Sequence, residues 1–317
     1  MLTSQDLGQR VSVRRRVEDG LTDVLGHLLD VTDDHLDVLA RGEVLSLPTA
    51  DVTAAKVVPP ATPRRGWEVP SVTPDDMQRI CWAGWPARDT ELLGDWALRA
   101  HGGITGRANS AMAVGDPGLP VPDALAAVES WYAGRGLPPL LQLPLADPAN
   151  LVMADQGWPR LHVTVVQVAP IAAVLHGIDQ VSVDDDLCTV VEPVPSTDWR
   201  SLMHDLDTGD PESHVAILTG PERVGFATLF RGDEPVGIGR VSVEGEWAGV
   251  TSVDVAPAAR RQGIGSAVMA ALLGWAEQQG ASSTYLQVRA ANPGALKLYD
   301  ALGYVTHHPY GYRAPAA

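Results

Sequence analysis

Hydrophobic and polar residues alternate in short runs over the first 58 residues of the chain. Val11 and Val13 stand between polar neighbours, and two further runs of this kind cover 24–29 and 35–39. Turn-forming residues separate the runs, with Gly20 closing the first turn. Short alternating segments divided by turns predict several short strands, and this spacing is typical of a small β-barrel.

The order of elements repeats itself in the rest of the chain. Each copy has a helix that ends in glycine, an apolar strand, a polar turn and a second helix followed by glycine and an aromatic residue. The copies cover 124–158 and 266–304, and Gly157 stands opposite Gly303 at an offset of 146 residues. This repeat predicts a duplicated α/β unit, and chance similarity of two α/β segments is the alternative.

Two breaks in the pattern indicate where the units begin. Prolines at 59, 60 and 63 prevent both helix continuation and strand pairing. A weaker break lies near 177–186, where three consecutive aspartates favour solvent. The first segment resembles an SH3-like or Sm-like barrel in its layout. The predicted divisions are therefore an SH3-like β-barrel at 1–58, a Pro-rich linker at 59–66, and two α/β units at 67–180 and 181–317.

Composition and charge exclude several classes of protein. The chain has 317 residues, of which 45% are hydrophobic and 20% are charged, as in ordinary globular proteins. Its formal net charge of −16 repels phosphate backbones, so we do not expect a nucleic-acid partner. The first residues show no signal pattern and no apolar run reaches about 18 residues, so we expect a cytoplasmic protein without a membrane partner.

The cysteines and histidines predict no metal centre. Cys81 and Cys188 lie far apart and form no CxxC pair, which excludes a disulfide framework and a cysteine-based zinc site. His35, His307 and His308 have no partner at the spacing of metal ligands. We therefore expect no metal cofactor.

A glycine loop between a strand and a helix gives the strongest indication of chemistry. Alternating residues predict a strand that runs to Val255, and Gly263 and Gly265 then open directly into a helix. Glycines let backbone N–H groups converge on one point, and a helix N-terminus adds free donors and the positive end of a dipole. With Arg260 and Arg261 beside it, the loop predicts a site for an anion such as a pyrophosphate.

Two other phosphate-binding loops do not fit this stretch. A Walker loop requires lysine and then serine or threonine after its last glycine, but Ser266 follows Gly265 directly. A dinucleotide fingerprint requires a third glycine where Val268 stands. A purely structural glycine loop is the remaining alternative.

The loop and the residues after it resemble the acetyl-CoA signature of the GNAT acetyltransferase superfamily. Arg260, Gly263 and Gly265 meet the pattern Arg/Gln-x-x-Gly-x-Gly/Ala after a strand at 250–255. The next strand, the asparagine and the closing Leu-Tyr-x-x-Leu-Gly-Tyr/Phe of the family follow in order at 284–288, Asn292 and 298–304. The resemblance covers about 187–313 and implies the GNAT acyl-CoA N-acyltransferase fold, an α/β (α+β) class.

The resemblance implies a role for each matching residue. Backbone groups of the strand would bind the acetyl carbonyl and the pantetheine arm, which means Val253, Asp254 and Val255. The loop would hold the pyrophosphate through Arg260, Arg261, Gln262, Gly263, Ile264, Gly265 and Ser266. Asn292 would bond the pantetheine arm or the CoA backbone, and Tyr299 would protonate the departing CoA thiolate.

The middle segment lacks this signature where the repeat predicts it. The residues at 115–120 include Asp116 and two prolines but no arginine, and an aspartate there opposes phosphate binding. No tyrosine of this segment matches Tyr299. We therefore expect a degenerate GNAT-like unit in a tandem arrangement, which also occurs in the superfamily. This unit either shapes the acceptor pocket, through residues such as Arg107 and Trp131, or only completes the packing.

These observations predict an N-acetyltransferase that moves an acetyl group from acetyl-CoA, its co-substrate, to a primary amine. The acceptor is a small-molecule or protein amine, and the net charge of −16 suits a cationic one. The amine must lose a proton before it attacks, but Glu244, Glu246 and Asp254 fit surface positions and no base is assigned. The alternative is a non-catalytic acyl-CoA-binding sensor or adaptor protein.

Overall fold

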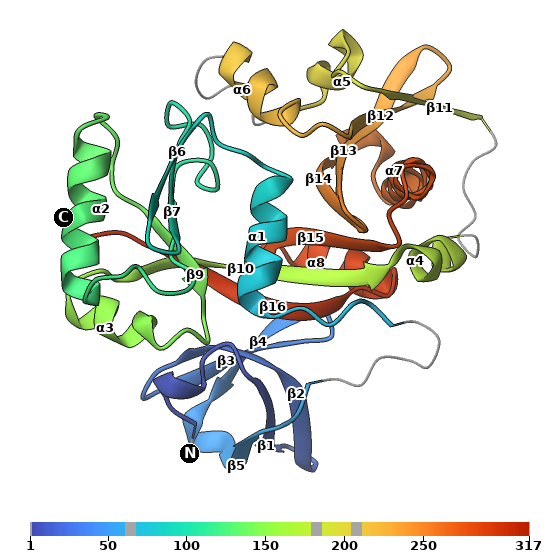
Figure 1. The fold of residues 1–317 in the computed structure, drawn as a ribbon. Helices are drawn as coiled ribbons and strands as arrows, with labels where there is room; N and C mark the ends of the chain where they lie inside the picture. The colour runs from blue at the N-terminus through green and yellow to red at the C-terminus, as the bar shows by residue number, and fades with distance from the viewer. Residues whose placement is uncertain (1, 61–67, 179–185, 204–210, 317) are drawn as a thin grey trace.

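A computed structural model describes residues 2–60, 68–178, 186–203 and 211–316, and Figure 1 shows the path of the chain. Most of the predicted linker at 59–66 and most of the predicted break at 177–186 lie outside the described residues. The described residues form a sheet of five strands near the N-terminus and a sheet of eleven strands from the rest of the chain.

The first sheet is antiparallel and has the strand order β4-β3-β2-β1-β5. Its strands are β1 (Arg10–Val17), β2 (Gly20–Val31), β3 (His35–Ala40), β4 (Glu43–Pro48) and β5 (Val52–Val57). The alternation in the sequence places Val11, Val13 and Val38 on the inner side, where they are fully buried. The short strands agree with the sequence pattern, while closure of the sheet as an SH3-like barrel stays a prediction.

The second sheet combines strands from both copies of the repeat, in the order β11-β12-β13-β14-β15-β10-β16-β9-β8-β7-β6. The middle segment supplies β6 (Asp89–Leu93), β7 (Trp96–Ala100), β8 (Ala111–Met112), β9 (Leu141–Pro144) and β10 (Arg160–Pro170). The C-terminal segment supplies β11 (Leu187–Glu192), β12 (Val224–Arg231), β13 (Glu234–Glu244), β14 (Trp247–Val255), β15 (Ser283–Arg289) and β16 (Val305–Arg313).

The helices follow the same repeat. They are α1 (Pro74–Ala83), α2 (Val121–Ala133), α3 (Ala149–Asp155), α4 (Ile171–Ile178), α5 (Thr197–Ser201), α6 (Pro211–Leu218), α7 (Ile264–Gln278) and α8 (Pro293–Ala301). Short 3-10 helices cover Ser4–Asp6, Thr49–Asp51 and Pro257–Ala259. The series α2-β9-α3-β10 matches α7-β15-α8-β16, which is consistent with the predicted tandem layout. Within the described residues, every helix is too short or too polar to span a lipid bilayer.

The two copies exchange their last strands. β10, from the middle segment, lies between β15 and β16 of the C-terminal segment and pairs antiparallel with both. β16 in turn lies between β10 and β9 of the middle segment. Each copy therefore completes the other copy's part of the sheet, and in Figure 1 the sheet runs without interruption from one to the other.

Helices cover both faces of the large sheet. α1 lies on one face, where Met77 and Cys81 pack with Tyr285 and other aromatic residues of the sheet (Figure 1). α7 packs on the opposite face against β12, β13 and β14. Gly237 and Gly239 of β13 permit this close approach, because a Cβ atom at either position would lie 2.6 Å from a side-chain atom of α7.

The five-stranded sheet rests against α8. Glu43 of β4 pairs with Lys297 of α8, with 3.6 Å between Oε2 and Nζ. A Cβ atom on Gly42 would lie 2.9 Å from the carbonyl oxygen of Leu296, so the turn before β4 touches the helix backbone. The first sheet therefore supports the helix that carries Tyr299, one of the predicted site residues.

Candidate active site

Two parallel strands separate in the middle of the large sheet. β14 and β15 pair only as far as Val250 and Leu286. Beyond that point β14 continues beside β13 alone, so one edge of its last residues is unpaired. An unpaired strand edge can hydrogen-bond an extended ligand as a neighbouring strand would. The predicted residues Val253, Asp254 and Val255 lie on this free edge.

A β-bulge marks the place where the strands part. Ile238 and Arg240 of β13 are two residues apart, but their partners Asp254 and Thr251 on β14 are three residues apart. The bulge includes Ser252, whose φ of +53° lies in the left-handed region. A bulge bends its strand and increases the local twist, so the backbone of β14 itself directs the strand away from β15.

The glycine loop leads from β14 to α7. Arg261 and Gly263 adopt left-handed φ values of +63° and +79°. Gly263 is the N-cap of α7, and no side chain caps this helix. The N–H groups of the first turn, at 264–266, therefore have no partner within the helix and point out of its end. Such an end binds anions well, because free donors and the helix dipole act together.

Arg260 and Gln262 stabilise the loop. Arg260 donates from Nε to the carbonyl oxygen of Val255 at 3.0 Å, and its Nη2 lies 3.6 Å from Oδ1 of Asp254. Gln262 donates to the carbonyl oxygen of Ala258 at 2.9 Å. Oδ1 of Asp254 also accepts the backbone N–H of Val255 at 2.8 Å. The Asp254 carboxylate is therefore engaged at the strand end.

The other two predicted residues lie at α8. Asn292 is its N-cap, and Oδ1 of Asn292 accepts the backbone N–H three residues later at 3.1 Å. Tyr299 is buried in edge-to-face contact with Tyr304, and burial raises the pKa of Tyr299 to about 12. A Cβ atom on Gly265 would lie 3.4 Å from Cδ2 of Leu298, so the start of α7 lies beside α8.

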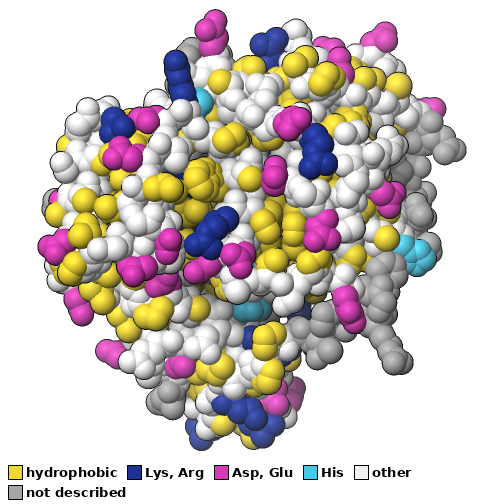
Figure 2. Space-filling view, in the orientation of Figure 1, with side chains coloured by type: hydrophobic (Ala, Val, Ile, Leu, Met, Phe, Trp, Pro, Cys, Tyr) yellow, Lys and Arg dark blue, Asp and Glu magenta, His cyan; other side chains and the backbone are white. Residues whose placement is uncertain are grey.

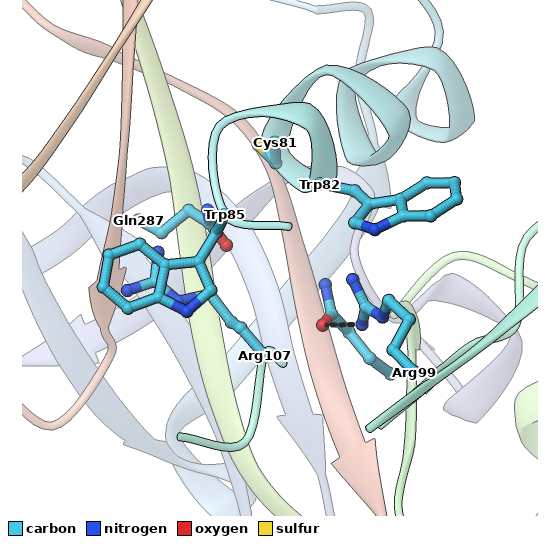
Figure 3. A pocket seen from close by; sticks show the side chains of 7 residues that line it. Cys81, Trp82, Trp85, Arg99, Arg107 and Gln287 are labelled. Carbon is cyan, nitrogen blue, oxygen red and sulfur yellow. Dashed lines mark hydrogen bonds between the residues drawn. The ribbon is translucent and has the colours of Figure 1, made fainter. Parts of the chain in front are cut away.

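A hollow lies next to the separated strands, on the face covered by α1. It measures about 180 Å³ with its open mouth included, and Figure 3 shows the side chains around it. Its lining comes from the middle and C-terminal segments and consists of Cys81, Trp82, Trp85, Arg99, Arg107, Gln142 and Gln287. Gln287 directly follows Leu286, the last residue of β15 that pairs with β14. The hollow therefore lies beside the place where β14 and β15 stop pairing, on the face of the sheet opposite α7.

The sequence pattern singles out Arg107 among the lining residues and misses most of the others. Trp131, the other residue that we expect to shape the acceptor pocket, is not among the lining residues of the hollow and donates from Nε1 to Glu91 at 2.7 Å. A usable signal existed for Gln142 and Gln287, because the repeat aligns these two polar residues within apolar strands. Arg99 gave no such signal, since an arginine in a strand ordinarily indicates the solvent side.

The loop of the middle segment is closed by its own acids. Oδ2 of Asp95 accepts the backbone N–H of Asp116 at 2.9 Å, and Oδ1 of Asp116 accepts that of Gly118 at 2.8 Å. Carboxylates thus take donors that a phosphate group would need. This geometry supports the expectation that the middle copy is degenerate.

The structure places two acids near His35, although their spacing in the sequence does not indicate a metal site. Nε2 of His35 lies 3.7 Å from Oδ1 of Asp37, and Asp30 completes a group whose ligand atoms lie within 4.8 Å of one another. The strands β2 and β3 bring these residues together across a turn that sequence spacing does not reveal. Arg160 pairs with Asp30, so a cation of the chain itself already neutralises part of the group.

Comparison with solved structures identifies the arrangement as a GNAT fold. A GCN5-related N-acetyltransferase from Kribbella flavida matches with a TM-score of 0.59 at 17% identity, covering 77% of this chain and 96% of that chain. A tandem GNAT protein from the clavulanic acid biosynthesis pathway matches with a TM-score of 0.53 at 14% identity, covering 77% and 88%. At these identities the likeness concerns the fold.

The family follows from the sequence. The model of the family described as "Probable histone acetyltransferase Rv0428c C-terminal" matches residues 77–313, and the chain belongs to this family. The uncharacterized N-acetyltransferase YobR of Bacillus subtilis is 29% identical over 243 residues, which are 74% of this chain and 96% of YobR. The probable histone acetyltransferase Rv0428c of Mycobacterium tuberculosis is 27% identical over 324 residues, covering 98% of this chain and 96% of that protein. The protein is therefore a GNAT acetyltransferase by family.

Proposed function

We propose that this protein moves an acetyl group from acetyl-CoA to a primary amine of a second substrate. The observation that carries the proposal is the free edge of β14, which leads through a short loop into the uncapped N-terminus of α7. The pantetheine arm of acetyl-CoA needs strand-like hydrogen bonds, and its pyrophosphate needs an anion site. One continuous stretch of chain offers both.

Residues of β14, the loop and α8 hold acetyl-CoA in this proposal. Backbone groups of 253–255 bond the acetyl carbonyl and the pantetheine arm. The backbone N–H groups of 261–266, together with the side chain of Arg260, bind the pyrophosphate. Asn292 offers its Nδ2 to the pantetheine arm or the CoA backbone, because its Oδ1 already caps α8.

The transfer is a substitution at the thioester carbon. The neutral amine attacks the carbonyl carbon, a C–N bond forms, the C–S bond breaks, and CoA leaves as a thiolate. Backbone N–H groups of β14 stabilise the carbonyl oxygen as negative charge develops on it. Tyr299 donates its proton to the thiolate, and its pKa of about 12 means that the phenol carries this proton throughout the neutral range.

The proton that the amine loses passes to water in this proposal, and water returns a proton to the Tyr299 phenolate before the next turnover. Glu244 and Glu246 lie at the turn between β13 and β14, at the opposite end of β14 from the free edge. Asp254 is held by Arg260 and by a backbone N–H. None of these three acids is placed to serve as the base.

Calorimetric titration with acetyl-CoA and with CoA tests the proposal first. We expect one site per chain, because the middle loop is closed by Asp95 and Asp116. Thiol release is then followed with a panel of small amines and with lysine-containing peptides, since one relative is named a probable histone acetyltransferase. Binding without turnover of any amine would favour a sensor or adaptor, and no binding would overturn the proposal.

A further inference from the structure

Three arginine side chains lie at or near the hollow, and two of them contact the Trp85 ring. Cζ of Arg107 lies 4.5 Å from the centre of the Trp85 ring, and Cζ of Arg240 lies 5.1 Å from it. Arg99 lines the same hollow, as Figure 3 shows. Arg99 and Arg240 are almost fully buried, with 2% and 0% of their surface exposed. The chain as a whole has the opposite charge, −16, and acidic side chains are scattered over the face seen in Figure 2.

No carboxylate of the described residues bonds any of these three arginines. Arg99 and Arg240 donate only to carbonyl and hydroxyl oxygens and to the side-chain amide of Gln142, all of which are neutral. Nη1 of Arg107 is buried and has no hydrogen-bond partner. Buried positive charge without a counter-charge is costly, so this arrangement favours binding of an anion.

A second arginine–tryptophan pair provides the contrast. Cζ of Arg135 lies 3.5 Å from the centre of the Trp131 ring, and Nε of Arg135 donates to Oδ2 of Asp89 at 2.6 Å. Glu91 accepts the indole N–H of Trp131. The Trp131 pair is therefore neutralised by two carboxylates, Asp89 and Glu91. At Trp85, no carboxylate of the described residues bonds the neighbouring arginines.

The hollow also lies where a second substrate would approach the thioester of the proposed reaction. Gln287 stands beside the separation of β14 and β15. Arg240 donates to Oγ1 of Thr251, at the start of the free edge of β14. α7 and the glycine loop, which would hold the cofactor, lie on the other face of the sheet. An anion at the hollow is therefore close to the reacting carbon and separate from the pyrophosphate.

We infer that the acceptor is a small amine that also carries a carboxylate, and that Arg107 binds this carboxylate between Trp85 and Gln287. The inference rests on the proposed acetyl transfer and names its substrate class. A guanidinium group binds a carboxylate through two parallel N–H donors, which fixes the orientation of the amine toward the thioester. Arg99 adds positive potential from the wall of the hollow, and Arg240 adds it from behind the Trp85 ring.

Binding requires Arg107 to move. The hollow is too narrow in this conformation for a free water molecule, and Arg107 rests on the Trp85 ring. Turning the guanidinium away from the ring breaks the cation–π contact, but it breaks none of the hydrogen bonds found among the described residues. A bound carboxylate replaces that contact with two charge-assisted hydrogen bonds, so the movement is favourable.

This substrate class differs from the cationic acceptor that the net charge of −16 suggests. Charges on the outer surface are screened over about 8 Å at physiological ionic strength, whereas charges within a buried site are screened far less. The arginines therefore decide what binds in the hollow, and the net charge acts only on the approach of the substrate.

Matched acceptor pairs test the inference. Ornithine against putrescine, and lysine against cadaverine, differ by a single carboxylate. We expect kcat/KM for the carboxylated member to be about tenfold to 100-fold higher, because a hydrogen bond to a charged group contributes about 1.5–3 kcal/mol. Arg107→Ala should remove this preference, while Arg107→Lys, which keeps the charge but not the two-pronged geometry, should retain part of it. Calorimetry with N-acetylglycine, against N-methylacetamide, gives a readout that does not depend on turnover.

Arg135→Ala is the matched control, since it removes an arginine from a tryptophan that lies outside the hollow. It should leave both the preference and the binding of N-acetylglycine unchanged. Equal turnover of both members of each pair, or a preference for basic peptides over the amino acids, would overturn the inference while acetyl-CoA binding continued to support the proposed function. Loss of acetyl-CoA binding itself would overturn the proposed function, whereas Arg107-dependent binding of N-acetylglycine would still be measurable.

Discussion

The middle and C-terminal segments each have a loop that joins a strand to a helix with no side-chain cap at its N-terminus. The two loops differ in which groups accept their backbone N–H hydrogen bonds. In the middle loop, Asp95 and Asp116 accept backbone N–H groups at 2.9 and 2.8 Å. In the C-terminal loop, between 256 and 263, no carboxylate of the described residues accepts a backbone N–H, and Arg260 donates to the carbonyl oxygen of Val255. One backbone arrangement thus binds its own acids in one copy and leaves its donors for a ligand in the other.

The difference shows that acids of the chain itself can accept the N–H groups of such a loop while the neighbouring strand and helix are kept. The Asp116 carboxylate accepts the backbone N–H of Gly118, so it stabilises the loop that precedes α2. At the same offset that relates Gly157 to Gly303, Met153 stands opposite Tyr299 and is fully buried. The middle copy has an apolar side chain where the C-terminal copy has Tyr299, the residue that we propose as the proton donor.

Placing an acid in the C-terminal loop should have the largest effect. Gly265→Asp puts a carboxylate at the first turn of α7, where it repels the pyrophosphate but does not disturb the helix dipole. We expect the Kd for acetyl-CoA to rise by about 100-fold or more, since two charges about 4 Å apart interact by several kcal/mol near a protein surface. Calorimetry measures the Kd.

Gly265→Asn is the matched control for this substitution, because it adds nearly the same volume without the charge. A Cβ atom at this position meets Leu298 at 3.4 Å, so a small steric loss is expected from both variants. If Gly265→Asp and Gly265→Asn raised the Kd for acetyl-CoA equally, steric crowding and not charge would explain the loss of affinity.

Removing the hydroxyl of Tyr299 should give the next largest effect. Tyr299→Phe makes the C-terminal copy resemble the middle copy at this position, and turnover should fall about 100-fold because general acid catalysis typically contributes 10²–10⁴-fold. Acetyl-CoA affinity should stay within about twofold of the wild-type value, since the phenol acts on the leaving thiolate. Stopped-flow measurement of thiol release gives kcat, and an unchanged kcat would contradict the proposed role of Tyr299 as the proton donor.

A pH series compares one buried tyrosine from each copy. Burial raises the pKa of both Tyr132 and Tyr299 to about 12 from the ordinary value of 10.0. The folded protein therefore holds these protons more tightly than the unfolded chain, and their contribution to stability is complete below pH 10 and is lost as the pH rises toward 12. Each phenol should account for at most about 2–3 kcal/mol of this loss.

Urea unfolding at pH 8 and at about pH 11 measures this loss for wild type, Tyr132→Phe and Tyr299→Phe. Both variants should lose less stability than wild type between the two pH values, by similar amounts. Only Tyr299→Phe should lower turnover at pH 8. A comparable fall in turnover for Tyr132→Phe would remove the functional distinction between the copies.

Opening the middle loop should have the smallest effect. Asp116→Asn weakens the bond to Gly118 and should reduce the free energy of unfolding by about 1 kcal/mol. The stoichiometry of acetyl-CoA binding should stay at one, because the middle loop still has no arginine. A second binding site in calorimetry would show that this single acid is what closes the middle copy.

Sequence patterns could predict the C-terminal loop because its parts are local. Strand, glycines, arginine and helix follow one another between Val250 and Gln278, so short-range propensities decide them, and α7 begins only two residues before the expected position. The bulge at Ser252 could not be predicted, since it arises from register with β13. The hollow also escaped prediction, because Arg99 and Gln287 meet through strand pairings that the linear sequence does not encode in its periodicity.

Because β10 and β16 are exchanged, neither segment forms its part of the large sheet without the other. A chain that lost the middle segment would expose an edge of β15 and of β16 in the centre of the sheet, so the segment cannot be deleted even though its own loop is closed. Neither copy can finish folding until strands separated by more than about 100 residues meet, which gives the chain a high contact order and favours slow, joint folding over independent domains. The middle segment is therefore required for the large sheet through its strand β10, independently of what its own loop binds.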